Sequence, residues 1–501
     1  MTTTQNDLPT HSPDDLLKDM EFQHVPIVSI GGGLGSFALV DRLRIGGVSA
    51  DDIRVVSLHR QPEQAFADAC RDSGMGPRDR LRSDSSARID NLWGFPGYAA
   101  REARETKRPS LMLRSLVEPV LAQPYAPTVG LVQHAVKEES ARIGWNHMTV
   151  RGMALRVQRQ PDGGYVVIVR RRGNRRDLAL VCDYVHLAIG PFGPKLTPEA
   201  VSFRLKHPYP QRLVHAYEQH SEVYDQLAEH GGSVLVRGSG IASSRVIQRL
   251  LEDRERSGQD IHIWQLFRHY HDQPTGPLLG RRDAGYGYAH QPYDYPKAAY
   301  GGQLRDTMKR RDESDRIALS RKLGATSTPY RTEWARPLRE ARAEGWYDAL
   351  AGEVHEFVAL QRDGKDQVRA KIRLANKETY QLDVDYVIDA TGMDQQAENH
   401  PLIHDLVEQG IADVNDLGCL RVDDNFMVVG SESHSENQSG AIFASGMNAR
   451  GGPLAPVDSF LGLQSAALSI ADVLADHGLG KRLTPARSVR QWWKWMGRKS
   501  L

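Results

Sequence analysis

The chain has 501 residues, more than the ~250–300 at which a single hydrophobic core stops growing, so two or three domains are expected. Its 40% hydrophobic and 25% charged residues are ordinary for a globular protein, and a net charge of +1 excludes a bulk attraction to nucleic acid or anionic membranes. No apolar run approaches the ~20 residues of a bilayer span, and the N-terminal residues lack a secretory pattern. We therefore expect a cytoplasmic protein without a nucleic-acid partner or a stable membrane contact.

The cysteines and histidines carry no redox or metal pattern. Cys70, Cys182 and Cys419 are the only cysteines, and none lies in a C-x-x-C pair, so neither a disulfide framework nor a dithiol redox centre is expected. The 19 histidines are scattered and predict no metal site. Arginine outnumbers lysine, which is typical of GC-rich bacterial genomes.

The first predicted elements are a buried strand over residues 25–30, the glycine turn Gly31-Gly32-Gly33-Leu34-Gly35-Ser36, and a helix through residues 37–43. In a dinucleotide-binding turn, the first glycine permits the tight turn, the second lets the backbone approach a pyrophosphate, and the third position needs a small residue. Gly31, Gly33 and Ser36 hold these positions. The helix would present its unpaired N–H groups and positive dipole end to the phosphates.

A second strand, over residues 53–58, completes the first β-α-β unit and ends at His59 and Arg60. An acidic residue is usual here, because a carboxylate accepts hydrogen bonds from the ribose hydroxyls. Arg60 favours a phosphate instead, so NADP in this first site stays open as an alternative. Residues 61–127 are irregular and aromatic, and either a loop packed on its own aromatic side chains or a functional segment fits them.

The chain then returns to the first sheet. A helix over residues 132–143 leads to a hairpin of strands 154–159 and 165–169, and a further strand over residues 184–189 ends at Gly190.

A second glycine turn, Gly238-Ser239-Gly240-Ile241-Ala242-Ser243, follows a strand over residues 232–237 and opens a helix over residues 245–251. The next strand, over residues 261–267, ends at Arg268. Because a guanidinium suits a ribose 2′-phosphate, Arg268 favours NADPH over NADH, and an ordinary solvated strand-end charge is the alternative. Two such turns in matching context indicate two dinucleotide sites in one chain.

Residues 270–330 form a long insertion, which we expect to be a substrate lid, with a partner surface as the alternative. A helix near residues 333–352 precedes strands over residues 354–360, 367–372 and 386–392. A last strand over residues 441–446 leads to a helix capped by Asp458. We expect the tryptophan-rich tail near residue 493 to dock on its own protein rather than on a membrane.

These landmarks, from Val25 to Leu474, resemble those of the flavin-containing monooxygenases and their Baeyer–Villiger and ornithine/lysine N-hydroxylase relatives. A monooxygenase fingerprint of the form F-x-G-x-x-x-H survives only as the aromatic Tyr209 and the histidine His215, which indicates a divergent branch. The resemblance implies an α/β fold with two Rossmann-like, glutathione-reductase-type domains in a three-layer ββα arrangement. Two short segments, Ala188-Ile189-Gly190 and Ala390-Thr391-Gly392, would link the domains.

The implied domain division has five parts: a flexible arm (1–22), the first part of the FAD-binding domain (23–200), the NADPH-binding domain with an inserted lid at 270–330 (201–385), the completion of the FAD-binding domain (386–480), and a tail (481–501). The resemblance places FAD on the first turn and NADPH on the second. The residues expected to bind cofactor are Gly31, Gly33, Leu34, Gly35, Ser36, His59, Arg60, Trp93, Gly190, Gly238, Gly240, Ile241, Ser243, Arg268, Thr391, Gly392, Gly446 and Asp458. His215 and Asn91 are the catalytic candidates.

The function implied is an FAD-dependent, NADPH-using monooxygenase that passes one oxygen atom of dioxygen, from a flavin 4a-hydroperoxide, to nitrogen or sulfur of a small-molecule substrate. The helix near Asp458 would point its dipole at the flavin. An NADPH oxidase or reductase without oxygen transfer, and a non-enzymatic cofactor-binding partner protein, stay open as alternatives. The sequence also leaves open whether the protein is a homo-oligomer.

Overall fold

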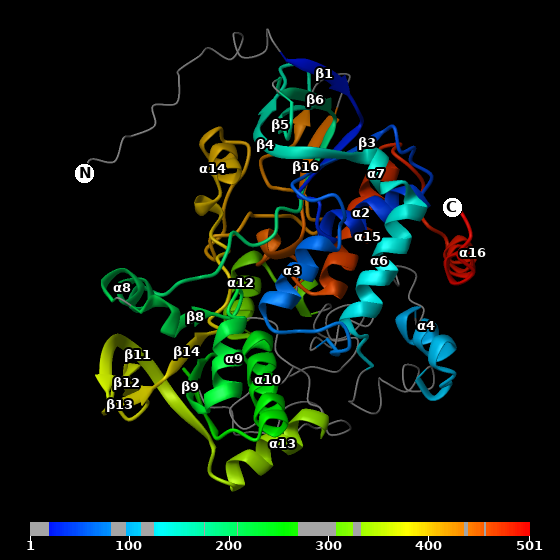
Figure 1. Cartoon of the computed structure of the whole chain (residues 1–501). Coiled ribbons are helices and arrows are strands. Elements are labelled where there is room, and N and C mark those ends of the chain that lie inside the picture. Colours follow the sequence, from blue (N-terminus) through cyan, green and yellow to red (C-terminus); the bar gives the residue numbers. More distant parts are fainter. Residues whose placement is uncertain are drawn as a thin grey trace.

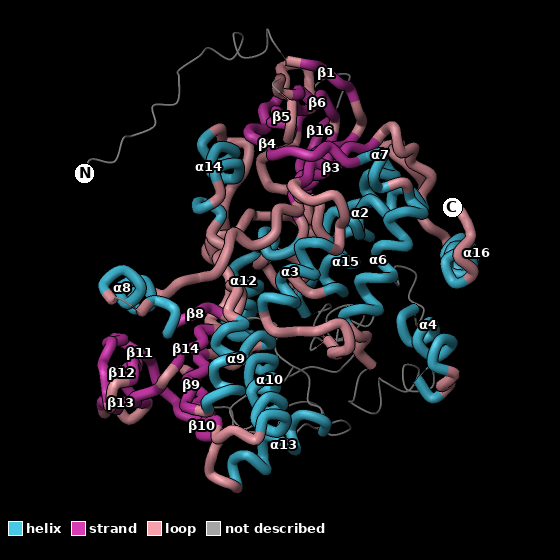
Figure 2. Tube along the Cα trace, viewed as in Figure 1, coloured by secondary structure: helices cyan, strands magenta, loops and turns pink. Residues whose placement is uncertain are grey.

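The computed structural model of the chain (Figure 1) describes residues 20–81, 97–111, 125–174, 176–207, 209–268, 307–323, 332–434, 439–454 and 457–501. Its strands form two sheets, one of nine strands and one of seven. Both have a parallel centre, and helices lie against each of them (Figure 2). The predicted α/β class is therefore confirmed.

The first sheet has the strand order β1-β6-β5-β4-β3-β2-β7-β16-β15. Its strands are β1 (Glu21–His24), β2 (Ile27–Ile30), β3 (Ile53–Ser57), β4 (Thr149–Arg159), β5 (Tyr165–Arg171), β6 (Leu178–Cys182), β7 (Tyr184–Leu187), β15 (Ser433–His434) and β16 (Ser439–Ala444). The central strands β4, β3, β2, β7 and β16 run parallel. Every residue of β2 and β7 is buried, as expected of parallel strands that are covered on both faces.

The first sheet also contains the predicted hairpin, which β6 extends to an antiparallel meander of β4, β5 and β6. Side chains of the meander, such as Val157 and Val167, share one hydrophobic core with the parallel strands and with the helices packed on them. Helices α2 and α15 contact each other over this sheet, and α6 contacts α2. Helices, parallel sheet and meander give the predicted three-layer ββα arrangement.

The helices of this first unit are α2 (Leu34–Ile45), α3 (Gln64–Asp72), α4 (Gly97–Thr106), α6 (Val129–Ile143), α7 (Trp145–Met148), α14 (Pro401–Glu408) and α15 (Phe460–Asp476), with short 3₁₀ turns η3 (Ala397–Asn399) and η4 (Gly446–Ala449). Helix α6 begins where the Thr128 hydroxyl accepts a hydrogen bond from the Leu131 N–H, and it ends at Gly144 in the left-handed conformation. Helices α3 and α4 lie within the region from 61 to 127 that the sequence analysis left irregular.

The second sheet has the order β13-β12-β11-β10-β9-β14-β8, and its parallel centre comprises β11, β10, β9, β14 and β8. Its strands are β8 (Leu213–His215), β9 (Gly232–Arg237), β10 (Ile261–Phe267), β11 (Tyr347–Arg362), β12 (Lys365–Leu374), β13 (Thr379–Val384) and β14 (Tyr386–Asp389). The helices are α8 (Pro198–Lys206), α9 (Ser221–His230), α10 (Ile241–Ser257) and α13 (Thr332–Ala343), with the 3₁₀ turn η2 (Pro210–Arg212) before β8.

Alternate residues of β9 face opposite sides of this sheet. Val234 and Val236 join the core under α9, α10 and α13, whereas Leu235 joins the core under α8. The strand is thus covered by helices on both faces, and its carboxyl end opens into the second glycine turn.

Two predictions about this region are wrong. The helix predicted near residues 333–352 is too long, because α13 ends at Ala343 and Tyr347 begins β11, which pairs in parallel with β10. Strand β14 lies between β9 and β8 in the second sheet, although residues 386–389 were assigned to the completion of the first domain. In both cases strand pairing across the sheet, which a local pattern does not contain, decides the outcome.

The chain crosses between the sheets after β7 and again after β14, and the two crossings pair with each other. The Lys195 N–H donates to the Gly392 carbonyl at 3.0 Å, and the Asp394 N–H donates to the Gly193 carbonyl at 2.8 Å. Pro194 and Met393 form an isolated antiparallel bridge. The two linkers therefore form one double-stranded connection, in agreement with the linking role expected of these segments.

The C-terminal helix α16 (Pro485–Met496) lies against α4. The buried Trp495 ring lies under the guanidinium of Arg101, 3.5 Å from the ring centroid, and Arg104 donates to the Met496 carbonyl at 3.3 Å. The tail thus docks on its own protein, as predicted. Within the ranges that the structure describes, no helix is both long and apolar enough to cross a bilayer.

Candidate dinucleotide-binding sites

The first glycine turn packs so tightly that its first position accepts only glycine. Gly31 has φ +97°, and a Cβ added there would lie 2.3 Å from the carbonyl oxygen of Ala188, which follows β7. The neighbouring Gly32 is close to the end of β3, since its Cβ would lie 2.2 Å from the Ser57 hydroxyl oxygen. Backbone conformation and close approach both require glycine at Gly31.

Gly33, the second glycine of the binding motif, borders open space. Gly33 is the N-cap of α2, has extended backbone angles and makes no side-chain cap. A Cβ added to Gly33 would meet nothing within 4 Å. The first helical turn, Leu34 to Ser36, has N–H groups without intrahelical acceptors, and these groups form the positive end of the helix dipole. This combination of open space and unpaired N–H groups suits a phosphate.

The third position, Ser36, is fully buried. Its hydroxyl donates to the Gly31 carbonyl and accepts a hydrogen bond of 2.7 Å from the Ser29 hydroxyl. Gly35 is similarly confined, because a Cβ there would lie 3.2 Å from both the Ala188 Cβ and the Ser445 hydroxyl. The small residues at this end of α2 let the helix lie close to strands β2 and β7.

The residues at the end of β3 lie beside this turn. The His59 N–H donates to the Ser57 hydroxyl at 3.0 Å, and the Arg60 side chain is exposed. Leu58, which the sequence analysis did not single out, is 64% exposed and offers apolar surface at the same strand end. An apolar residue at the last position of a predicted strand, directly before the polar strand-end residues, is the signal that would have marked it.

The second glycine turn repeats this plan. Gly238 has φ +137°, and its Cβ would lie 2.6 Å from the carbonyl oxygen of Ala390, which follows β14. Gly240 is the N-cap of α10 without a side-chain cap, and its Cβ would meet nothing within 4 Å. Ile241 begins the helix, and the buried Ser243 donates to the Gly240 carbonyl at 3.0 Å. In both turns, the first glycine lies against the carbonyl of an alanine that follows the adjacent parallel strand.

Strand β10 supplies two residues to the second turn. Arg268 follows the strand, with its side chain exposed, and β10 is the parallel neighbour of β9. Gln265 is fully buried; its amide group donates to the Gly238 carbonyl at 2.8 Å and accepts from the Tyr347 hydroxyl at 2.6 Å. Sequence reasoning missed Gln265, although a glutamine inside an apolar strand signals a buried polar contact.

His215 lies at the end of β8, fully buried and in register with Asp389 on β14. Its Nδ1 accepts from the Tyr217 N–H at 3.2 Å, and burial lowers the pKa of its imidazole, an effect opposed by the carboxylates of Asp389 and Glu218. Asp389 also forms an ion pair of 3.5 Å with Arg237. The structure thus places this catalytic candidate in a charged cluster beside the linkers, and a catalytic role for it stays a prediction.

Two glycines in the linkers have positive φ angles, which residues other than glycine rarely adopt. Gly190 has φ +79° and Gly392 has φ +107°. The Thr391 N–H donates to the Asp389 carboxylate at 3.0 Å, and its hydroxyl donates to the Lys195 carbonyl at 3.4 Å. The chain therefore leaves the first sheet at Gly190, and it leaves the second sheet at Thr391 and Gly392.

The predicted cap of the last helix is wrong. The N-cap of α15 is Ser459, whose hydroxyl accepts from the Gly462 N–H at 3.0 Å, and the exposed Asp458 precedes it. Gly446, with φ +72°, begins η4 after β16. It lies near α15, because a Cβ added to Gly446 would be 3.5 Å from the Leu463 side chain. Aspartate and serine both suit an N-cap, so sequence alone did not separate them.

The two turns are connected by contacts between the domains. Arg245 on α10 is 3% exposed and donates to the Asp79 carboxylate at 2.8 Å and to the Gly74 carbonyl at 3.1 Å. Burial and the nearby Asp458 carboxylate raise the pKa of the Tyr217 hydroxyl to about 12. Arg245 and Tyr217 were missed, because their partners are distant in sequence.

Part of the insertion also reaches the first domain. Helix α12 (Glu313–Leu323) contributes Glu313, which pairs with Arg421 at 2.8 Å, and Arg316, which pairs with Asp424 at 2.7 Å. Most of residues 270–330, together with Asn91 and Trp93, lies outside the described residues. 

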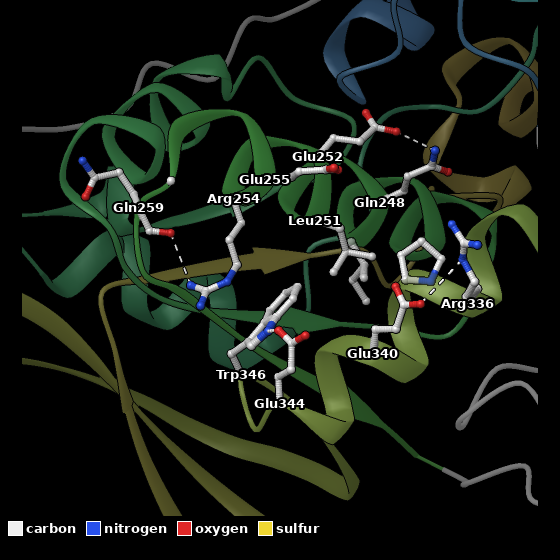
Figure 3. A pocket seen from close by; sticks show the side chains of 13 residues that line it. Gln248, Leu251, Glu252, Arg254, Glu255, Gln259, Arg336, Glu340, Glu344 and Trp346 are labelled. Atoms are coloured by element: carbon white, nitrogen blue, oxygen red, sulfur yellow. Dashed lines mark hydrogen bonds and ion pairs between the residues drawn. The ribbon is translucent and has the colours of Figure 1, made fainter.

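A separate groove of about 570 Å³ lies between α10 and α13, with Leu251 and Trp346 among its lining residues (Figure 3). It includes the carboxyl end of α10, at Gly258 and Gln259, and so it is distinct from the turn at the amino end.

In the described ranges no group of three His, Cys, Asp or Glu side chains could hold a metal ion. His400 and His404 are four residues apart, but His400 caps α14 and His404 pairs with Glu408 at 3.3 Å.

No protein-family model matches the chain, and no curated protein matches it significantly. Solved structures do match along almost its whole length. The chain has the fold of the N-hydroxylating flavin monooxygenases. The reduced ornithine hydroxylase of Pseudomonas aeruginosa superposes with a TM-score of 0.59 at 15% identity, over 91% of this chain and 100% of that one.

Two further structures give the same result. The FAD-bound cadaverine monooxygenase of desferrioxamine biosynthesis from Erwinia amylovora has a TM-score of 0.63 at 13% identity, covering 92% of this chain and 97% of that one. The ornithine N-hydroxylase of Kutzneria sp. 744, with reduced FAD, NADP⁺ and L-ornithine, has a TM-score of 0.62 at 14% identity, covering 91% and 100%. The resemblance drawn from the glycine turns thus agrees with the observed fold.

Proposed function

We propose that this protein is an FAD- and NADPH-dependent monooxygenase that transfers one oxygen atom of dioxygen to a nitrogen of a small-molecule amine. The observation that carries the proposal is the pair of matching glycine turns, each with a first glycine packed against a strand and a second glycine open to a ligand. The neighbours in fold act on ornithine and cadaverine, which supports an aliphatic amine as the substrate class.

The first turn fits FAD. Gly31, Gly33 and the first-turn N–H groups of α2 would hold the pyrophosphate, while His59 and Arg60 would replace the usual acidic residue near the ribose. When bound there, the flavin supplies the activation of dioxygen that protein side chains cannot provide. The N-terminus of α15, free of acidic residues in its first turn, offers its positive dipole end to anionic charge.

The second turn fits NADPH. Gly238, Gly240 and the N-terminus of α10 would hold its pyrophosphate, and Gln265 fixes the turn by binding the Gly238 carbonyl. Arg268 would bind the 2′-phosphate, because its side chain is exposed directly after β10, the strand next to β9. The pair Arg245–Asp79 would keep this turn in a fixed relation to the first domain during hydride transfer.

We propose the same domain division as the sequence predicts, with one change. An FAD-binding domain interrupted by an NADPH-binding domain accounts for the two sheets, and β14 is included in the NADPH-binding domain. The paired linkers would then be the boundary between them.

The test is a balance of NADPH consumed, hydroxylamine formed and hydrogen peroxide released by the purified protein loaded with FAD. Ornithine, lysine and cadaverine are the amines to compare, with NADH as the cofactor control. The proposal predicts hydroxylamine formation in proportion to NADPH for at least one aliphatic amine. Stoichiometric peroxide with every amine would show an oxidase instead and would contradict the proposal.

A further inference from the structure

Four buried polar side chains lie beneath the first glycine turn. Ser29 on β2, Ser36 on α2, His186 on β7 and Ser445 after β16 are each at most 3% exposed. Strands β2, β7 and β16 are adjacent, and Ser29 stands opposite His186 in the register of β2 and β7. Buried polar groups are costly unless they are hydrogen-bonded, so each of these side chains needs a partner.

The four side chains form a continuous series of contacts. Ser445 Oγ lies 2.9 Å from His186 Nε2, and His186 Nδ1 lies 2.8 Å from Ser29 Oγ. Ser29 Oγ lies 2.7 Å from Ser36 Oγ, and Ser36 Oγ contacts the carbonyl oxygen of Gly31. The series therefore begins at β16, crosses two strands and ends on the backbone of the glycine turn.

The number of available hydrogens fixes the direction of three bonds in this series, and the charge of the His186 ring fixes the fourth. A carbonyl oxygen only accepts, so Ser36 donates its single hydrogen to Gly31 and must accept from Ser29. Ser29 has then used its own hydrogen, and its contact with His186 requires a proton on Nδ1. Full burial lowers the pKa of His186 to about 3, so the ring is neutral and Nε2 accepts from Ser445.

This direction has a consequence for the turn. The peptide that joins Gly31 to Gly32 is planar and trans, so its N–H points away from its carbonyl. By holding the Gly31 carbonyl, Ser36 directs the Gly32 N–H to the side of the peptide that faces away from Ser36. Hydrogen bonds in such a series polarise one another, which strengthens the last bond.

The second turn lacks this arrangement. Ser243, at the position that corresponds to Ser36, donates to Gly240 within its own turn at 3.0 Å. The Gly238 carbonyl, which corresponds to that of Gly31, accepts from Gln265 instead. Ser243 is therefore a matched control for Ser36.

We propose that the series Ser445, His186, Ser29 and Ser36 positions the Gly31 peptide for a dinucleotide pyrophosphate, and that these four are positioning residues of the first site. The proposal rests on the proposed function, because it takes the ligand of that site to be FAD. Ser36 stands in place of a third glycine because its hydroxyl completes the series.

The first experiment uses the wild-type protein and needs no cofactor. Nitrogen-15 NMR of the histidine rings, with His186 assigned by comparison with His186→Gln, reports which ring nitrogen carries the proton. We expect a neutral ring with the proton on Nδ1. A proton on Nε2, or a charged ring at neutral pH, would overturn the proposed direction even if the protein binds no FAD.

The second experiment measures the dissociation constants of FAD and NADP⁺ for Ser29→Ala, Ser36→Ala and the control Ser243→Ala. Ser29→Ala interrupts the series without changing a residue of the turn, and we expect it to raise the FAD constant about tenfold, as for one lost buried hydrogen bond. Its NADP⁺ constant should not change, and Ser243→Ala should leave the FAD constant unchanged. Unchanged FAD binding in Ser29→Ala, or an equal loss of both cofactors, would overturn the proposal.

The two experiments separate the possible failures. If the wild-type protein binds neither cofactor, the proposed function fails, whereas the ring proton still decides the direction of the series. If FAD binds and Ser29→Ala has no effect, the proposed function stands and the positioning role is refuted.

Discussion

Arg245, on the helix that follows the second glycine turn, donates to the carboxylate of Asp79 in the first domain at 2.8 Å. The guanidinium is almost fully buried and also binds the Gly74 carbonyl, so it connects two domains through both a charge and a backbone group. The helix that would bind NADPH is thereby attached to the domain that would bind FAD.

Replacing this arginine should weaken the connection between the domains. We expect Arg245→Ala to lower the free energy of unfolding by about 2–3 kcal/mol, as for hydrogen bonds to a buried charged group. NADPH should also reduce the bound flavin more slowly. Chemical denaturation and anaerobic flavin reduction measure the two effects.

Arg71→Ala is the matched control, since Arg71 is 68% exposed and its partner Asp68, which is 36% exposed, lies on the same helix. It should leave both quantities close to those of the wild type. Equal effects of the two substitutions would contradict the connecting role of Arg245.

Gly33 and Gly31 should respond differently to alanine. At Gly33 the backbone is extended and a Cβ has open space, so Gly33→Ala should change the free energy of unfolding by less than about 1 kcal/mol. The same Cβ would occupy space meant for the pyrophosphate, so the FAD dissociation constant should rise at least about tenfold. Gly31→Ala should destabilise the fold itself.

Titration with FAD, together with thermal unfolding of the cofactor-free protein, tests this pair. Wild-type FAD affinity in Gly33→Ala would show that the open side of the turn does not face the cofactor. Gly240→Ala is the corresponding substitution in the second turn and should affect NADPH instead.

Arg268 should distinguish the two nicotinamide cofactors. Loss of a charge-assisted contact to the 2′-phosphate in Arg268→Ala should raise the apparent KM for NADPH about tenfold or more, with little change for NADH. Steady-state rates with each cofactor provide the comparison. An equal effect on both would refute the 2′-phosphate assignment.

The buried Asp41 on α2 should make stability depend on pH. Burial, and the neighbouring Glu139 carboxylate, raise the pKa of Asp41 well above its ordinary value, while Arg142 and Arg42 oppose the shift. The folded state then binds a proton that the unfolded state has lost, so this residue's contribution to stability falls as the pH rises above the unfolded-state pKa.

We therefore expect Asp41→Asn to be more stable than the wild type at neutral pH, and this advantage to shrink toward acidic pH. Denaturant unfolding of both proteins between about pH 4 and pH 8 gives the difference, because the unfolded-state aspartate titrates near the lower limit. A difference that does not vary with pH would show that Asp41 is ionised in the folded protein.

The sequence was sufficient to predict the local features of the fold. Gly31 and Gly238 follow buried strands and precede helices, a pattern contained within about twenty residues. Both turns have the expected close packing, because the glycine requirement is a backbone property. The hairpin of β4 and β5 was predicted for the same reason.

The features that sequence reasoning missed depend on contacts between distant residues. Ser29 and His186 are 157 positions apart, and Arg245 and Asp79 are 166 apart, so no local pattern relates them. The placement of β14 depends on its pairing with β8 and β9. The true cap, Ser459, differs from the predicted one by a single position, because aspartate and serine both suit an N-cap and only the hydrogen bond to the Gly462 N–H distinguishes them.

The most direct test of the whole account is anaerobic mixing of the FAD-loaded protein with NADPH while the flavin absorbance is followed. If the two turns hold FAD and NADPH in one working arrangement, the flavin absorbance bleaches with NADPH, and more slowly with NADH. A protein that binds both cofactors and shows no bleaching would contradict the central claim.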